Sequence, residues 1–162
     1  MTDDLRRIRI CLAIVITGLV LSGLTAFPLV HESALVVNLV ARFGTDTALY
    51  VWIAQVHQAL VATSAAYPYL AYGTDWLAFA HLVLAVLFIG PWRDPVRDRW
   101  VIEFDLIACA GVLPLALIAG PIRGIPLFWR IGDCSFGIIG AIPLLIALKA
   151  VHRLEDRVRA EA

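Results

Sequence analysis

One stretch of the sequence decides the class of the fold: IRICLAIVITGLVLSGLTAF, at Ile8–Phe27. Arg9 carries the only charge of this stretch. Pro28, a residue that disfavours continuation of a helix, follows the stretch directly. A membrane-spanning helix needs about 20 consecutive, mostly apolar residues to cross the hydrocarbon core of a bilayer. The stretch therefore predicts a transmembrane helix.

Three further apolar stretches of similar kind follow along the chain. They are Thr74–Ile89, Val101–Ala119 and Leu127–Leu148. Together with the first stretch they predict an all-α polytopic membrane protein, a bundle of four transmembrane helices. No internal repeat, glycine-rich linker or low-complexity tract interrupts the sequence, so we expect residues 1–162 to form a single transmembrane domain.

The composition agrees with an integral membrane protein and excludes several other classes. Of the 162 residues, 61% are hydrophobic and only 16% are charged, which is far more apolar than a typical soluble domain. Lys and Arg together number 13, as do Asp and Glu, so we expect no nucleic-acid partner. The 3 cysteines are too few for a disulfide scaffold.

The distribution of positive charge predicts the orientation in the membrane, because Lys and Arg accumulate in short cytoplasmic loops. With four crossings, the N-terminus, the loop Pro91–Trp100 and the C-terminal tail lie on one side. That side holds 10 of the 13 Lys and Arg residues, namely Arg6, Arg7, Arg9, Arg93, Arg97, Arg99, Lys149, Arg153, Arg157 and Arg159. We therefore expect both termini to be cytoplasmic.

The segment between the first two predicted helices, Pro28–Gly73, is too long for a simple turn and too apolar for disorder. Apolar residues repeat at helical spacing over Ser33–Phe43 and again over Asp46–Thr63. We interpret the outer region 30–66 as two short amphipathic helices that lie on the outer leaflet or cap the bundle. A rival interpretation has Ala48–Ala66 cross the membrane as a fifth helix, which would invert the orientation of everything after it.

Ionisable side chains at membrane depth are candidate functional residues, because they are costly to bury there. His81 and Asp133 lie at matching depths in the second and fourth predicted helices. At ~1.5 Å per residue, His81 is about 10.5 Å from the start of its helix at Thr74, and Asp133 is about 9 Å from the start of its helix at Leu127. A histidine beside a carboxylate can move a proton or bind a polar headgroup. Arg130 lies one helical turn before Asp133, on the same face of the helix. The expected ligand-binding site consists of His81, Arg123, Arg130 and Asp133.

Plainer roles stay open for the same kind of residue. Arg130 and Asp133 can pair with each other while His81 donates a hydrogen bond to a neighbouring carbonyl. Asp75, next to Thr74 at the start of the second predicted helix, is expected to stabilise the N-terminus of that helix.

The sequence indicates no cofactor, metal site or catalytic residue. The 4 histidines form no HExxH motif or other close ligand pair, and the 3 cysteines form no CxxC motif. The sequence also contains no Walker loop, GxGxxG fingerprint or GxSxG elbow.

Small residues and two prolines predict how the helices pack and bend. Gly18 with Ser22, and Gly137 with Ala141, are pairs at four-residue spacing that allow two helices to approach closely. Pro114 lies inside the third predicted helix and Pro143 inside the fourth, and each is expected to free a backbone carbonyl and bend its helix.

Three segments carry a family resemblance: YGTDWLAFAH at Tyr72–His81, GPWRDPVRDRWVIEF at Gly90–Phe104 and GPIRGIPLFWRIGDCSFG at Gly120–Gly137. They resemble segments of small bacterial inner-membrane proteins with four helices. The resemblance implies a multi-pass protein of the bacterial cytoplasmic membrane. It implies no particular activity, cofactor or catalytic residue.

Three classes of function fit these observations. We expect first a protein that binds or carries a lipid or small amphiphile in an outward-facing pocket within the membrane. The second class is a structural or assembly partner of another membrane protein, or of a second copy of this chain. The third is an intramembrane enzyme that uses His81 and Asp133 as an acid-base pair.

Overall fold

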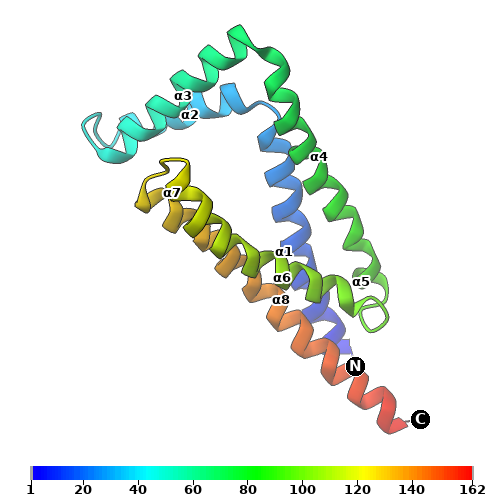
Figure 1. Cartoon of the computed structure of the whole chain (residues 1–162). Helices are drawn as coiled ribbons and strands as arrows, with labels where there is room; N and C mark the ends of the chain where they lie inside the picture. Colours follow the sequence, from blue (N-terminus) through cyan, green and yellow to red (C-terminus); the bar gives the residue numbers. More distant parts are fainter. Residues whose placement is uncertain (1, 162) are drawn as a thin grey trace. The chain divides into compact units, whose positions relative to one another are not determined.

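The computed structural model of the chain describes residues 2–161, and every regular element in this range is a helix (Figure 1). The elements are α1 (Thr2–Ala26), α2 (Leu29–Ala41), α3 (Ala48–Ala66), the 3-10 helix η1 (Pro68–Leu70), α4 (Ala71–Leu87), α5 (Ile89–Arg93), α6 (Arg99–Pro114), the π-helix η2 (Leu115–Ala119), α7 (Gly120–Ile122) and α8 (Leu127–Glu161). Four helical segments in the described range are long and apolar enough to cross a membrane: Asp3–Ala26, Pro68–Arg93, Arg99–Ile122 and Leu127–Ala160. The predicted all-α class with four long apolar helices is confirmed.

Contacts divide the chain into two compact units. Unit 1 takes residues 1–18 and 85–162, and unit 2 takes residues 19–84. Helices α1 and α4 each contribute residues to both units. The single domain expected from the sequence stays a prediction.

In unit 1, α6 and α8 run side by side in opposite directions, from Arg99 beside Glu155 to Cys109 beside Gly137 (Figure 1). A Cβ atom at Gly137 would stand 2.5 Å from the carbonyl oxygen of Cys109, so only glycine permits this approach. The close contact predicted at Gly137 is confirmed. At Gly18, by contrast, no described atom lies within 4 Å of such a Cβ atom, and the contact expected there is not seen.

The hydrophobic core of unit 1 gathers side chains from both ends of the chain. Its fully buried members include Ile8, Leu12, Phe88, Ile102, Leu144 and Val151. Ile8 and Leu12 are four residues apart, so they lie on the same face of α1. Close packing of such side chains gives van der Waals contacts, which stabilise helix association in lipid as well as in water. Packing against the rest of unit 1 thus holds the first turns of α1.

Helix α8 continues to Glu161, although the predicted fourth helix ends at Leu148. The expected end is wrong because the apolar run stops at Lys149 while residues with high helix propensity continue beyond it. Val151 and Leu154 are still buried in this extension. The extension is therefore packed in unit 1 as far as Leu154, and the last residues of α8 are exposed.

One ion-pair group in unit 1 centres on the buried carboxylate of Asp4. Nε of Arg153 donates to Oδ1 of Asp4 over 3.1 Å, and Nη1 of Arg157 lies 3.1 Å from Oδ2. Each oxygen of the carboxylate therefore faces one guanidinium group. A buried carboxylate is tolerated when it is paired in this way.

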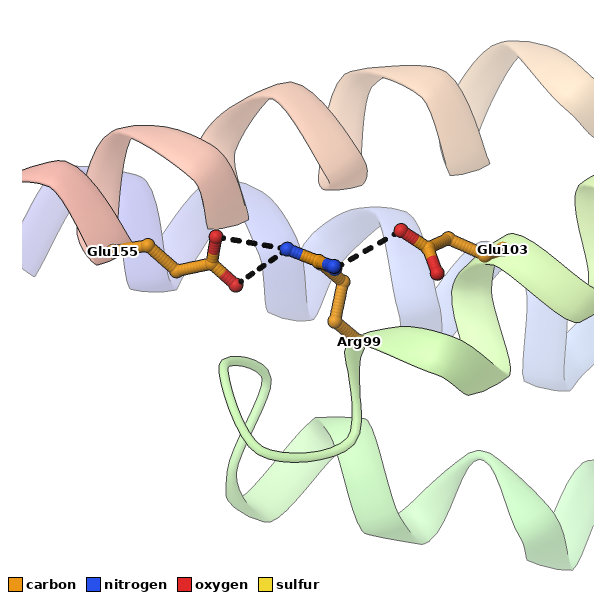
Figure 2. A network of polar contacts seen from close by, with 3 residues as sticks. All are labelled: Arg99, Glu103 and Glu155. Atoms are coloured by element: carbon orange, nitrogen blue, oxygen red, sulfur yellow. Dashed lines mark hydrogen bonds and ion pairs between the residues drawn. The ribbon is translucent and has the colours of Figure 1, made fainter.

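A second ion-pair group joins α6 to α8 (Figure 2). Arg99 lies between two glutamates, and its Nη1 donates to both carboxylate oxygens of Glu155 over 3.0 and 3.1 Å. Its Nε is 2.9 Å from Oε1 of Glu103, one turn further along α6. The guanidinium of Arg99 thus bridges two carboxylates of its own chain.

The end of α6 shows how the chain accommodates Pro114. The α-helix ends at this residue and continues as the π-helix η2. Proline has no N–H to donate to the preceding turn, and a π-turn is one way for a helix to absorb such a defect. The disturbance predicted at Pro114 takes the form of a change in helix type.

In unit 2, α2 and α3 pack against each other (Figure 1). Ser33 Oγ and His57 Nδ1 are 2.9 Å apart and form a hydrogen bond between the two helices. In the turn before α3, Gly44 has a φ of +119°, which favours glycine. Thr47 caps α3, because its Oγ1 accepts a hydrogen bond of 3.2 Å from the N–H of Tyr50.

Both helices occupy the outer region predicted from the sequence, residues 30–66. Their amphipathic character stays a prediction, because large apolar side chains such as Leu35 and Val51 are exposed. Helix α3, which covers the proposed fifth crossing, is not among the described helices that are apolar enough to cross a membrane. The rival topology therefore gains no support from the structure.

Helix α4 begins at Ala71, earlier than the predicted start at Thr74. The reason is Pro68, which opens the 3-10 turn that leads directly into α4. Asp75 therefore lies in the second turn of α4, and the helix-terminus role expected for it is wrong. Further along, a Cβ atom at Gly23 of α1 would stand 2.9 Å from the carbonyl oxygen of Ala78, which is a close approach within unit 2.

Candidate functional site

The four residues predicted to bind a ligand fall in different units: His81 lies in unit 2, and Arg123, Arg130 and Asp133 lie in unit 1. Their assembly into one site stays a prediction. Within α4, Nδ1 of His81 donates a hydrogen bond of 2.8 Å to the carbonyl oxygen of Leu77. This is the hydrogen bond to a neighbouring carbonyl that the plainer interpretation expected.

Arg130 does not pair with Asp133, since no ion pair or hydrogen bond joins them within residues 2–161. The Arg130 side chain lies along Gly120, where a Cβ atom would stand 2.8 Å from its Cγ. Its Nε is buried and has no hydrogen-bond partner in the described structure. Arg123 ends α7 and is exposed. The mutual neutralisation expected of Arg130 and Asp133 is therefore wrong, because the arginine side chain is directed along α7 instead.

A pocket of about 300 Å³ lies within unit 2. Four parts of the chain line it: the turn after α1, the start of α2, the last turns of α3, and the segment from Tyr67 to the start of α4. The larger lining side chains are Phe27, Leu29, Val30, His31, Leu60, Tyr67, Leu70 and Asp75. The described lining contains none of the four residues predicted as a site.

The chemistry of this pocket combines apolar walls with a few polar groups. Phe27, Leu60 and Leu70 provide apolar surface, while His31 and Asp75 provide ionisable groups. Neither ionisable side chain has a hydrogen-bond or ion-pair partner among the described residues. A volume of this size with a few polar groups is typical of small-ligand sites. The arrangement offers contacts to both ends of an amphiphilic molecule.

Sequence reasoning missed this pocket because it depends on where helices begin. Asp75 resembles a capping residue only when α4 starts at Thr74, and His31 lies before the helical pattern that starts at Ser33. Tyr67-Pro68 is the available signal, because proline favours the first position of a helix and so predicts an earlier start.

Comparison of the chain with protein-family models, with curated proteins and with solved structures finds no match.

Proposed function

We propose that this protein is a multi-pass protein of the bacterial cytoplasmic membrane that binds or carries a lipid or small amphiphile in the pocket of unit 2. The observation that carries the proposal is the pocket itself, with its apolar walls and its unpaired groups Asp75 and His31. Apolar walls favour an alkyl or aromatic body through the hydrophobic effect. Unpaired polar groups favour a ligand with a polar head, because they gain hydrogen bonds when it binds.

Insertion into a bilayer is supported by the outer surfaces of the long helices. Large apolar side chains are exposed along them, including Ile14 and Leu21 of α1, Ile107 of α6 and Ile138 of α8. Exposed apolar area on this scale is unfavourable in water and is satisfied by lipid. The lipid bilayer is therefore the first partner that we propose.

The orientation that we propose places both termini in the cytoplasm, with 10 of the 13 Lys and Arg residues on that side. In this orientation the segment between the first two crossings, which contains α2 and α3, faces outward. The pocket of unit 2 is lined by this segment, so a ligand would enter it from the outer leaflet or the periplasm.

A binding assay with matched variants of α3 tests the proposal. Ser64 lines the pocket, whereas Gln58 of the same helix is exposed and does not line it. In nanodiscs we expect Ser64→Trp to weaken binding of a fluorescent alkyl-chain amphiphile by about tenfold or more, which corresponds to ~1.4 kcal/mol. Gln58→Trp should leave binding unchanged. Equal binding by the two variants, or no saturable binding to the unmodified protein, would contradict the proposal.

A further inference from the structure

A second hollow, of about 350 Å³, lies on the surface of unit 1 and is open to the surroundings. Helix α1 lines it with Leu5, Arg6, Arg9, Ile10 and Ala13, and α5 contributes Trp92. All six residues belong to the same unit, so the hollow is a local feature of its packing. It is separate from the pocket of unit 2.

The two arginines of this hollow differ from the three arginines of unit 1 that form ion pairs. Arg99, Arg153 and Arg157 all pair with carboxylates of the chain. Arg6 and Arg9 are exposed and pair with no carboxylate in the described part of the chain. Two unpaired guanidinium groups on one small surface attract an anion from outside the protein.

The remaining lining is apolar: Leu5 precedes the two arginines on α1, Ile10 and Ala13 follow them, and Trp92 comes from α5. Ile10 lies one turn beyond Arg6, and Ala13 lies about 10.5 Å beyond it at ~1.5 Å per residue. Trp92 is partly exposed beside them. The surface therefore changes from cationic to apolar along α1, in the direction in which the helix becomes a continuous apolar stretch.

We propose that this hollow binds one anionic phospholipid, with its phosphate between Arg6 and Arg9 and the upper part of an acyl chain against Ile10, Ala13 and Trp92. A phospholipid has the same sequence of groups, an anionic phosphate followed by hydrocarbon. Basic hollows beside membrane helices on the cytoplasmic side recognise anionic headgroups in this way, and indole rings favour the same depth. The inference rests on the membrane insertion and orientation proposed above, and it does not depend on the pocket of unit 2.

The test compares two variants of equal charge on the same helix. Arg6→Gln/Arg9→Gln removes the proposed phosphate ligands, whereas Arg7→Gln/Arg9→Gln keeps Arg6 and changes the net charge by the same amount; Arg7 does not line the hollow. Binding of phosphatidylglycerol to the detergent-solubilised full chain is measured by native mass spectrometry, with phosphatidylcholine as the zwitterionic lipid and inorganic phosphate as the free anion. We expect the first variant to weaken phosphatidylglycerol binding about 10- to 30-fold and the second about 3- to 5-fold.

A second readout reports on the acyl chain. In a chain whose other tryptophans, Trp52, Trp76, Trp100 and Trp129, are replaced by Phe, brominated phosphatidylglycerol should quench the fluorescence of Trp92 more strongly than brominated phosphatidylcholine. The Arg6→Gln/Arg9→Gln change should abolish this difference.

Three outcomes would overturn the lipid site: equal losses in the two arginine variants, equal binding of the two lipids, or inorganic phosphate that competes fully with phosphatidylglycerol. The last outcome would show a site for a free anion. The Ser64→Trp variant of the pocket in unit 2 should bind phosphatidylglycerol at the hollow as well as the unmodified protein does. Failure of the amphiphile assay in unit 2 and failure of the lipid assay at Arg6 and Arg9 are therefore separate results.

Discussion

Arg153 donates a hydrogen bond of 3.1 Å from Nε to Oδ1 of Asp4, and the two residues are 149 positions apart in the sequence. Arg157 lies 3.1 Å from the other oxygen of the same carboxylate. The beginning of α1 and the C-terminal part of α8 are thus joined by charge, and Ile8 and Val151 of the same two helices are fully buried in the same unit.

The pairing of Asp4 predicts an unusual order of stability among variants. Arg153→Gln/Arg157→Gln leaves the buried carboxylate without a partner, which is more costly than removing all three charges. We therefore expect this double variant to have a lower melting temperature than the triple variant that also carries Asp4→Asn. Thermal unfolding in one detergent, followed by tryptophan fluorescence, measures the order. A triple variant less stable than the double variant would show that the carboxylate of Asp4 is not penalised when it lacks both arginines.

The contact between α6 and α8 predicts opposite effects for two neighbouring glycines. A Cβ atom at Gly137 would stand 2.5 Å from the carbonyl oxygen of Cys109, whereas one at Gly140 would stand 3.4 Å from Sγ of Cys109. Gly137→Ala should destabilise the protein by about 1–3 kcal/mol, because the helices must move apart. Gly140→Ala should be neutral or stabilise it by up to ~1 kcal/mol, through its higher helix propensity. Equal effects in the same unfolding assay would contradict the close packing at Gly137.

Arg130 and Asp133 form no ion pair, and this predicts how their replacements combine. The losses of stability caused by Arg130→Gln and Asp133→Asn should add to within about 0.5 kcal/mol in the double variant. Chemical or thermal unfolding of the two single variants and the double variant measures the coupling. A double variant clearly more stable than the sum predicts would show that the two side chains interact.

The proposed orientation predicts which loops face the cytoplasm. Asp94 and Asp46 are both exposed and lie in different loops. In a variant whose native cysteines, Cys11, Cys109 and Cys134, are replaced by alanine, a membrane-impermeant maleimide added to intact cells should label Asp46→Cys. It should label Asp94→Cys only after the membrane is permeabilised. Labelling of Asp94→Cys in intact cells would reverse the topology.

The unpaired carboxylate in the pocket of unit 2 predicts a preference for positively charged heads. Asp75→Asn should reduce the preference for an alkylammonium amphiphile over a neutral one of equal chain length by roughly tenfold. Asp46→Asn removes the same charge outside the pocket and is the matched control. An unchanged preference in Asp75→Asn would exclude a direct role of this carboxylate, while binding itself is tested by Ser64→Trp.

Helix positions could be predicted from the sequence to a large extent, and a helix end could be predicted where a proline follows it but not where only the apolar run stops. The apolar stretch that ends before Pro28 gave an end for α1 within a residue or so, because proline stops a helix by its own chemistry. Lys149 is different, since it ends the apolar run and leaves the helix intact as far as Glu161. Hydropathy reports the chemical character of a segment, whereas a helix ends where backbone hydrogen bonds end.

The candidate pocket was less accessible to prediction than the helices. It depends on the turn around Tyr67 and Pro68, which places Asp75 inside α4. Helical spacing was a weaker guide for Arg130 and Asp133, because spacing along one helix does not determine the rotamer of a long side chain. Arg130 extends along Gly120, a residue that no periodic pattern connects to it.

Unit 1 is composed of the first 18 residues and residues 85–162, and this has a consequence for biosynthesis. The ribosome produces Asp4 long before Arg153, and at about 5–20 residues per second the intervening 149 positions take roughly 7 to 30 s. During this interval the nascent chain exposes a carboxylate and the apolar surface of Ile8 and Leu12 without their final partners. A nascent chain that is released before residue 153 therefore lacks the residues that pair with Asp4 and close unit 1.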